Sequence, residues 1–248
     1  MALKNNTWKI NQWYDQAVAG NVSYTGAKQL WTWGWNEVGQ LGQNSVIHRS
    51  SPVQVGGDTG YFFSKGLEIG DVSVGNYTAG SIKSDGTLWV WGYNNKGELG
   101  QNNQTNYSSP TQVGSSTDWN FVNMGYGFSS AIKTDGTLWM WGGQGANPNG
   151  TLGQNEGTAK YSSPVQVPGT TWRNISTGIV NVFATKTDGT LWVWGGQNDA
   201  GCLGLNQGGN YSQHMRSSPT EIFGGGTTWN QAATNSYFSA ATKTDGTL

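Results

Sequence analysis

One ten-residue pattern, Lys-x-Asp-Gly-Thr-Leu-Trp-x-Trp-Gly, constrains the fold of this chain more than any other feature. It occurs in full at residues 83–92, 133–142 and 186–195, while a fourth copy starts at Lys243 and a degenerate copy ends at Gly34. Asp-Gly is a strong signal for a two-residue type I′ turn, because glycine accepts a positive φ. The Leu-Trp-x-Trp that follows is rich in strand formers. Each copy therefore predicts a β-hairpin whose second strand ends at the glycine.

The pattern returns at intervals of 50 to 58 residues, and three other features keep step with it. Gly-x-Leu-Gly-x-Asn follows each strand, then Ser-Ser-Pro, then a short alternating run. Each unit thus holds about four short strands separated by turns, and no segment shows a sustained helical period. An all-β fold with four strands per unit at this period predicts a β-propeller. A β-solenoid is the alternative, although solenoid coils are usually shorter, at about 20–30 residues.

The same spaced motifs resemble a known family. Lys-x-Asp-Gly-Thr-Leu-Trp-x-Trp-Gly, then Asn-x-x-Gly-x-Leu-Gly, then Ser-Ser-Pro, is similar to the repeat of the regulator of chromosome condensation family, from about Trp8 to Leu248. The resemblance implies a β-propeller. It says less about function, because that propeller hosts exchange factors, ligase domains, inhibitors and scaffolds alike.

The repeats divide the chain unevenly. We expect an N-terminal half-blade over residues 1–30, followed by propeller repeats over 31–88, 89–138, 139–191 and 192–248. Five second halves stand against four first halves, and the chain stops where another Trp-x-Trp-Gly strand is due. The resemblance implies seven blades, so the expected reading is a piece of a longer protein. A strand-exchanged ring, a small ring and an open arc completed by a neighbour are the alternatives.

Composition limits the kinds of partner that this chain can bind. The formal net charge is −1 and only 11% of residues are charged, so we expect no nucleic-acid partner. No apolar run is long enough to cross a membrane, and the first residues do not resemble a signal peptide. Cys202 is the one cysteine, so no disulfide framework is expected.

Residues 11–16 have no counterpart in the other units and contain the adjacent aromatics Trp13 and Tyr14. One interpretation is a strand that caps the edge of the first blade, because an exposed edge invites aggregation. The other is a docking segment for another protein, since Trp and Tyr are enriched in interface cores.

The segments between Leu-Gly-x-Asn and Ser-Ser-Pro vary most between units. Because they share one position in the repeat, we expect them to line one face, where variable loops on a rigid scaffold often bind ligands. Uncommitted surface loops are the alternative. The candidate binding residues in these segments are His48, Tyr107, Tyr161 and Tyr211.

No catalytic or metal-binding constellation is evident, and we expect no cofactor. His48 and His214 lack a histidine or cysteine at ligand spacing. The repeated aspartates are explained by their turns. The turn residues assigned in this way are Asp85, Gly86, Asp135, Gly136, Asp188, Gly189, Asp245 and Gly246.

These observations favour a non-enzymatic β-propeller that binds a protein partner or acts as a scaffold. Low charge, abundant Asn, Gln, Gly and Thr and near-identical repeats also resemble propellers carried by marine bacteriophages. That resemblance implies a virion component bound to a capsid or tail protein; the cytoplasm is the other expected location. The alternatives are a cellular adaptor or guanine-nucleotide exchange factor, and a carbohydrate-binding module.

Overall fold

The structure is a computed structural model, and it describes residues 29–56, 72–143, 150–196, 201–206, 215–222, 224, 226–235 and 238–245. The described residues form strands, turns and loops without a helix, so none of them builds a helix able to cross a membrane. Three sheets contain four antiparallel strands each, which confirms the prediction of an all-β fold with four strands per unit.

The strands follow one another in chain order within each sheet. The first sheet pairs β1 (Trp31–Gly34) with β2 (Arg49–Gln54). The second contains β3 (Val72–Val74), β4 (Thr78–Ile82), β5 (Leu88–Gly92) and β6 (Tyr107–Gln112). The third contains β7 (Trp119–Met124), β8 (Phe128–Lys133), β9 (Leu138–Gly142) and β10 (Tyr161–Gln166). The fourth contains β11 (Trp172–Thr177), β12 (Asn181–Lys186), β13 (Leu191–Gly195) and β14 (Arg216–Glu221). The fifth pairs β15 (Trp229–Thr234) with β16 (Ser239–Lys243).

The four-stranded sheets and the sequence repeats are half a unit out of step. In the second sheet, β3 and β4 precede the Asp-Gly turn, while β5 and β6 carry the Leu-Trp-Val-Trp-Gly and Ser-Ser-Pro that follow it. Among the described strands, the first sheet therefore contains the two outer strands of a blade, and the fifth contains the two inner strands. The assignment of residues 1–30 as a half-blade lies almost wholly outside the described residues and stays a prediction.

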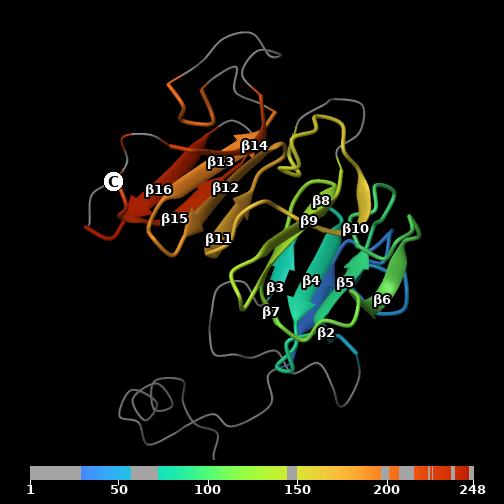
Figure 1. Ribbon diagram of the computed structural model, residues 1–248. Coiled ribbons are helices and arrows are strands. Elements are labelled where there is room, and N and C mark those ends of the chain that lie inside the picture. The colour runs from blue at the N-terminus through green and yellow to red at the C-terminus, as the bar shows by residue number, and fades with distance from the viewer. Residues whose placement is uncertain are drawn as a thin grey trace, which may run out of the picture.

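Successive sheets lie side by side in chain order, from the sheet that contains β2 to the sheet of β15 and β16 (Figure 1). The inner strands touch their counterparts in the next sheet. The Met124 amide donates to Ser73 Oγ at 2.9 Å, the Thr177 hydroxyl donates to Asn123 Oδ1, and the Thr234 amide donates to Ser176 Oγ at 3.2 Å. These contacts fix one inner strand to the next around the molecule.

The hydrophobic core lies between neighbouring sheets. One cluster joins the second and third sheets and includes Leu88 and Trp141, and another joins the third and fourth and includes Leu138 and Trp194. A smaller cluster joins the fourth sheet to the fifth around Leu191 and Leu203. In the second, third and fourth sheets the repeated leucine and the second tryptophan therefore pack between neighbouring sheets. Burial is worth about 1.5–3 kcal/mol for a leucine-sized side chain.

Candidate functional site

The Asp-Gly turn differs from the predicted type I′ hairpin. The Gly86 amide donates to the Lys83 carbonyl at 2.9 Å, and Gly86 has φ +79°. Asp85 is not among the residues with a positive φ, although a type I′ turn requires one at both central positions. The Lys83 amide also donates to the Thr87 carbonyl at 2.9 Å. This geometry is a type I turn over Ser84 and Asp85 followed by a left-handed glycine.

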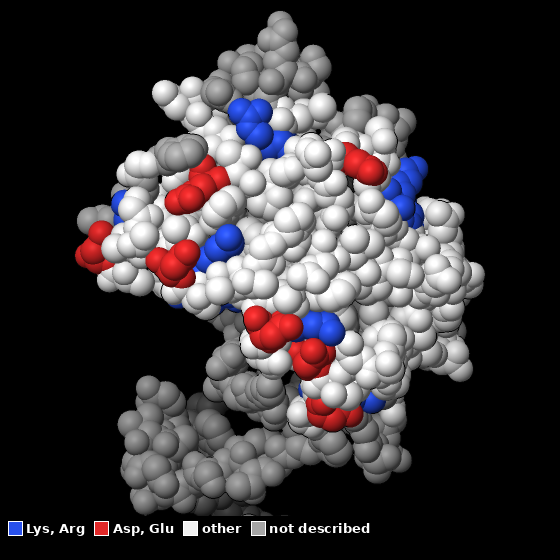
Figure 2. Space-filling model, viewed as in Figure 1, with Lys and Arg blue, Asp and Glu red and all other residues white. Residues whose placement is uncertain are grey.

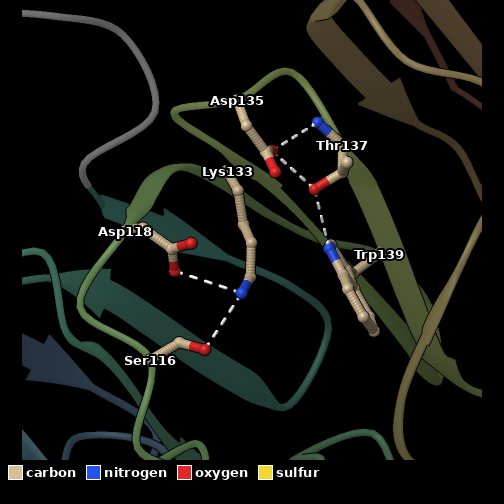
Figure 3. A network of polar contacts seen from close by, with 6 residues as sticks. All are labelled: Ser116, Asp118, Lys133, Asp135, Thr137 and Trp139. Atoms are coloured by element: carbon tan, nitrogen blue, oxygen red, sulfur yellow. Dashed lines mark hydrogen bonds and ion pairs between the residues drawn. The ribbon is translucent and has the colours of Figure 1, made fainter.

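The aspartate of each turn holds the threonine two residues further on, which in turn holds the following tryptophan (Figure 3). Asp135 Oδ1 accepts hydrogen bonds from the Thr137 amide at 2.9 Å and from its hydroxyl at 2.7 Å. The Trp139 indole donates to the same hydroxyl at 3.0 Å. The backbone and side-chain hydrogen bonds from Thr137 lower the pKa of Asp135 below its ordinary value. The same relay occurs at Asp85, Thr87 and Trp89, and at Asp188, Thr190 and Trp192.

The lysine of each turn packs on tryptophan rings. Lys133 Nζ lies 5.0 Å from the ring centroid of Trp119 and 5.3 Å from that of Trp139, and 3.1 Å from Asp118 Oδ1. It also donates to Ser116 Oγ at 3.0 Å (Figure 3). Sequence reasoning missed this role because the first of these indoles comes from the inner strand, which the turn motif does not contain. Cation–π contacts of this kind contribute about 0.5–2 kcal/mol.

The Gly-x-Leu-Gly-x-Asn segment receives the next blade. The Trp141 indole donates to the Glu98 carbonyl at 2.9 Å, and a Cβ added to Gly100 would lie 2.9 Å from Trp141 Nε1. The asparagine that ends the segment, Asn102, adopts φ +56°, and its amide donates to the Ser162 carbonyl at 2.6 Å. The motif is therefore a seat for the tryptophan and the Ser-Ser-Pro strand of the neighbouring unit.

His48 has a structural role at the edge of its loop. Its Nδ1 accepts a hydrogen bond from the Asn36 amide at 3.0 Å, as Asn106 Oδ1 does from the Asn94 amide at 2.8 Å. The imidazole remains exposed and stacks against Trp35, with ring centroids 6.3 Å apart. The loop histidine thus stands beside an exposed indole.

Tyr107 and Tyr161 begin outer strands and are half-buried against the hydrophobic clusters. The Tyr107 hydroxyl accepts a hydrogen bond from Asn103 Nδ2 at 3.0 Å. Both rings therefore pack against the core, and their part in binding stays a prediction. Trp13, Tyr14, Tyr211, His214 and Gly246 lie outside the described residues.

An exposed aromatic surface lies beside His48, and none of its four rings is a predicted binding residue. We call it the aromatic face and define it by Trp35, Tyr77, Tyr93 and Tyr126. The ring centroids of Trp35 and Tyr77 are 5.4 Å apart, and those of Tyr77 and Tyr93 are 5.9 Å apart. Tyr126 lies under Lys96, whose Nζ is 5.2 Å from the ring centroid.

The aromatic face surrounds a cavity of about 320 Å³ whose lining includes all four rings together with Lys96 and Glu98. Glu98 is buried, and its Oε2 accepts a hydrogen bond from the Lys96 amide at 2.7 Å. Burial raises the pKa of the Glu98 carboxyl above its ordinary value, against the opposing effect of that hydrogen bond. The cavity thus combines indole and phenol rings with one cation and one buried acid.

Topology explains why these rings meet. Trp35 follows β1 and Tyr93 follows β5, each directly after the Trp-Gly of its unit, and Tyr77 precedes β4 as Tyr126 precedes β8. The turn between the inner strands and the end of the third strand lie at the same end of each four-stranded sheet, because neighbouring strands are antiparallel. Aromatic residues just after Trp-Gly and just before the second strand of a sheet are the sequence signal that could have identified the aromatic face.

Charges are sparse over the molecule. Figure 2 shows Lys and Arg scattered among Asp and Glu on the viewed face, with broad uncharged areas between them. Across the described ranges, no group of three or more His, Cys, Asp or Glu is arranged to hold a metal ion.

Comparison with known proteins relates this chain to proteins built from one type of repeat. Residues 29–80 and 85–132 match the model of the regulator of chromosome condensation (RCC1) repeat. The X-linked retinitis pigmentosa GTPase regulator of dog is 35% identical over 92 residues, which are 37% of this chain and 9% of that protein. The human E3 ubiquitin-protein ligase HERC2 is 26% identical over 192 residues, which are 75% of this chain and 4% of that protein.

Solved structures agree on the fold. Human WBSCR16 superposes with a TM-score of 0.69 at 22% identity, over 86% of this chain and 52% of that one. Prp20p from Saccharomyces cerevisiae superposes with a TM-score of 0.67 at 18% identity, over 86% of this chain and 51% of that one. The protein therefore has the RCC1-type β-propeller fold, and these findings together support the RCC1 repeat family. The chain spans about half the length of these solved structures and less than a tenth of the two curated relatives.

Proposed function

We propose that this protein is a non-enzymatic β-propeller scaffold that binds a protein partner through the aromatic face. The observation that carries the proposal is the clustering of Trp35, Tyr77, Tyr93 and Tyr126 around one cavity. Tyrosine and tryptophan dominate the energetics of protein interfaces, because they bury large areas and keep a polar group for hydrogen bonding.

Packing between the sheets does not require the rings of the aromatic face. The tryptophans that hold the blades together, such as Trp91, Trp141 and Trp194, are buried and donate to carbonyls of the neighbouring unit. Trp35, Tyr77 and Tyr126 are exposed instead. The position of Trp35 is filled by Gly143 and Gly196 in later units, so the sheets form without an aromatic residue there.

The partner that we propose is a capsid or tail protein of a bacteriophage, with this chain as a virion component. Low charge, abundant Asn, Gln, Gly and Thr and near-identical repeats support this assignment. Prp20p is described as binding Gsp1p and histones, which shows that a protein of similar fold binds other proteins. Trp13, Tyr14, His48, Tyr107, Tyr161 and Tyr211 are proposed as further contacts.

The test is co-sedimentation of the purified chain with virus particles, compared with a double variant, Trp35→Ala with Tyr77→Ala. Loss of two interface aromatics should weaken binding by about 30-fold or more, since even one central anchor contributes about 2 kcal/mol. Phe238→Ala is the matched control, because it removes an exposed aromatic outside the face. Equal binding by both variants would contradict the role of the aromatic face.

The second candidate is a regulator of a small GTPase, favoured by the curated relative named as a GTPase regulator. Its test is a nucleotide-release assay, in which the propeller should accelerate loss of a fluorescent guanine nucleotide from the GTPase. Acceleration without particle binding would replace the scaffold proposal. A carbohydrate-binding module would instead show retention on a glycan array and loss of retention in the double variant.

A further inference from the structure

Glu98 is a buried acid whose charge the fold does not require. It is the second residue of a Gly-x-Leu-Gly segment, and the preceding unit has the neutral Gln40 at that position. Glu98 Oε2 accepts the Lys96 amide at 2.7 Å, and Gln40 Oε1 accepts the Val38 amide at 3.2 Å. Because a neutral amide oxygen makes the same contact, the negative charge of Glu98 needs a reason other than the local backbone.

The charge of Glu98 has no counter-ion within the part of the chain that the structure describes. The residue is 2% exposed, and no Lys, Arg or His nitrogen there lies at ion-pair distance from its carboxylate. The Lys96 ammonium lies instead 5.2 Å from the ring centroid of Tyr126. A buried carboxylate without a paired cation is costly, because it has lost the water that would solvate it. Glu98 is therefore suited to receive a cation from outside the chain.

The rings of the aromatic face line the same cavity as Glu98. The face of an aromatic ring carries partial negative charge and attracts a cation within about 6 Å of its centroid. Rings and carboxylate thus favour the same kind of occupant. All residues that line this cavity are described, and Tyr77, Tyr93 and Tyr126 stand in loops of complete four-stranded sheets. The combination of rings and acid therefore belongs to the interior of the repeat array.

The size and lining of the cavity suit one arginine side chain. Its volume of about 320 Å³ is at the small end of the range for ligand pockets, which is about 300–1,000 Å³. A guanidinium is planar, stacks on aromatic rings and is more weakly hydrated than an ammonium, so it enters an aromatic cavity at a lower desolvation cost than lysine does. Arginine is also enriched among the residues that dominate protein interfaces.

We propose that the aromatic face recognises an arginine side chain of the protein partner, whose guanidinium lies between the rings and neutralises Glu98. This assignment rests on the proposed binding of a protein at the aromatic face. Lys96 lines the same cavity and repels the arginine. Glu98 and Lys96 therefore have opposite effects on one ligand, and this opposition distinguishes recognition of a cation from simple burial of an apolar group.

The test is an NMR titration of the 248-residue chain with the peptide acetyl-Gly-Gly-Arg-Gly-Gly-amide. The signal to follow is the indole N–H of Trp35, identified by its loss in Trp35→Phe. We expect saturable shifts with this peptide, weaker binding of the same peptide with lysine in place of arginine, and no binding with citrulline, which has nearly the shape of arginine but no charge. Equal binding of the arginine and citrulline peptides would overturn the proposal, and equal binding of the lysine peptide would overturn the choice of arginine.

Three variants test the electrostatic origin of binding. Glu98→Gln should weaken binding of the arginine peptide by about tenfold or more, because it removes the charge that attracts the guanidinium. Lys96→Gln should strengthen it, because it removes the competing cation. Glu156→Gln is the matched control: it removes an exposed acid outside the cavity and should leave the affinity unchanged. Circular dichroism should show all three variants folded, and unchanged affinity in Glu98→Gln would contradict the proposal.

Co-sedimentation with virus particles separates this proposal from the proposed function. If Glu98→Gln binds particles as the native chain does while Trp35→Ala with Tyr77→Ala does not, the arginine proposal fails and the aromatic face remains the binding surface. If the native chain does not bind particles, the proposed virion role fails. The peptide titration then still decides whether the cavity accepts arginine, because it needs no particle. Loss of particle binding in Glu98→Gln together with a gain in Lys96→Gln would support both proposals.

Discussion

The Trp141 indole nitrogen lies 2.9 Å from the Glu98 carbonyl oxygen, to which it donates a hydrogen bond between two neighbouring sheets. Forty-three residues separate the two, and both side chains are buried. The same bond joins Trp91 to Gln40 and Trp194 to Thr151. Because one such bond joins each of the first three sheets to the next, the tryptophan fixes the position of one sheet relative to its neighbour.

The close approach at Gly100 gives the first prediction. Gly100→Ala should destabilise the protein more than Gly114→Ala, although both glycines have a positive φ. The left-handed backbone costs about 1–2 kcal/mol for either alanine. Only the Gly100 variant adds a Cβ at 2.9 Å from Trp141, since nothing lies within 4 Å at Gly114. Denaturant unfolding of both variants measures the difference, and equal losses would contradict the tight seat.

Trp141→Phe gives the second prediction. The change removes the indole hydrogen bond and leaves a cavity, so we expect a loss of about 1–3 kcal/mol in the free energy of unfolding. Trp35→Phe is the control, because Trp35 is exposed and surface substitutions usually stay within about 0.5 kcal/mol. Similar stabilities for the two variants would show that the bond between blades contributes little.

The sequence predicted the strands well because their signals are local. Asp-Gly followed by Leu-Trp-x-Trp identifies a hairpin within ten residues, and the period then orders the sheets. The turn type was wrong, because Asp85 and Gly86 suit either a type I′ turn or a type I turn with a left-handed glycine. The choice depends on one dihedral angle, that of Asp85, which residue type does not fix.

The candidate site was harder to predict, because its residues come from different units. Trp35 and Tyr93 share a repeat position, but Tyr77 and Tyr126 stand in turns of separate sheets. Tyr107 is a candidate binding residue because it lies in a variable segment, yet its ring packs against the core. Variation between repeats pointed to the end of the sheets at which the aromatic face lies, and only the three-dimensional packing separated exposed rings from buried ones.

The turn geometry gives the third prediction. Proline fits the second position of a type I turn, so Ser84→Pro should be neutral or stabilise the protein by up to about 1 kcal/mol. Thr134→Pro at the same place in the next unit should destabilise it, because the Thr134 amide donates to the Asp118 carbonyl at 2.8 Å. Thermal melts of the two variants provide the comparison. A large loss in Ser84→Pro would contradict the type I assignment.

The fourth prediction concerns Glu98, whose pKa is raised by burial. Below the ordinary pKa of glutamate, about 4.3, the carboxyl is protonated in both folded and unfolded states and contributes no pH dependence. Above it the unfolded chain releases the proton more readily than the folded one, so the buried acid lowers stability as pH rises towards its folded pKa. Glu98→Gln removes this cost.

Glutamine suits the site, because Gln40 fills the same position in the preceding unit and its Oε1 accepts the Val38 amide at 3.2 Å. In Glu98→Gln the side-chain oxygen should accept the Lys96 amide in the same way. We therefore expect a higher melting temperature than the native chain at pH 7, and equal melting temperatures of the two chains below about pH 4. Melts at a series of pH values measure the crossing, and a difference that persists unchanged into acid would show that ionisation of Glu98 is not its cause.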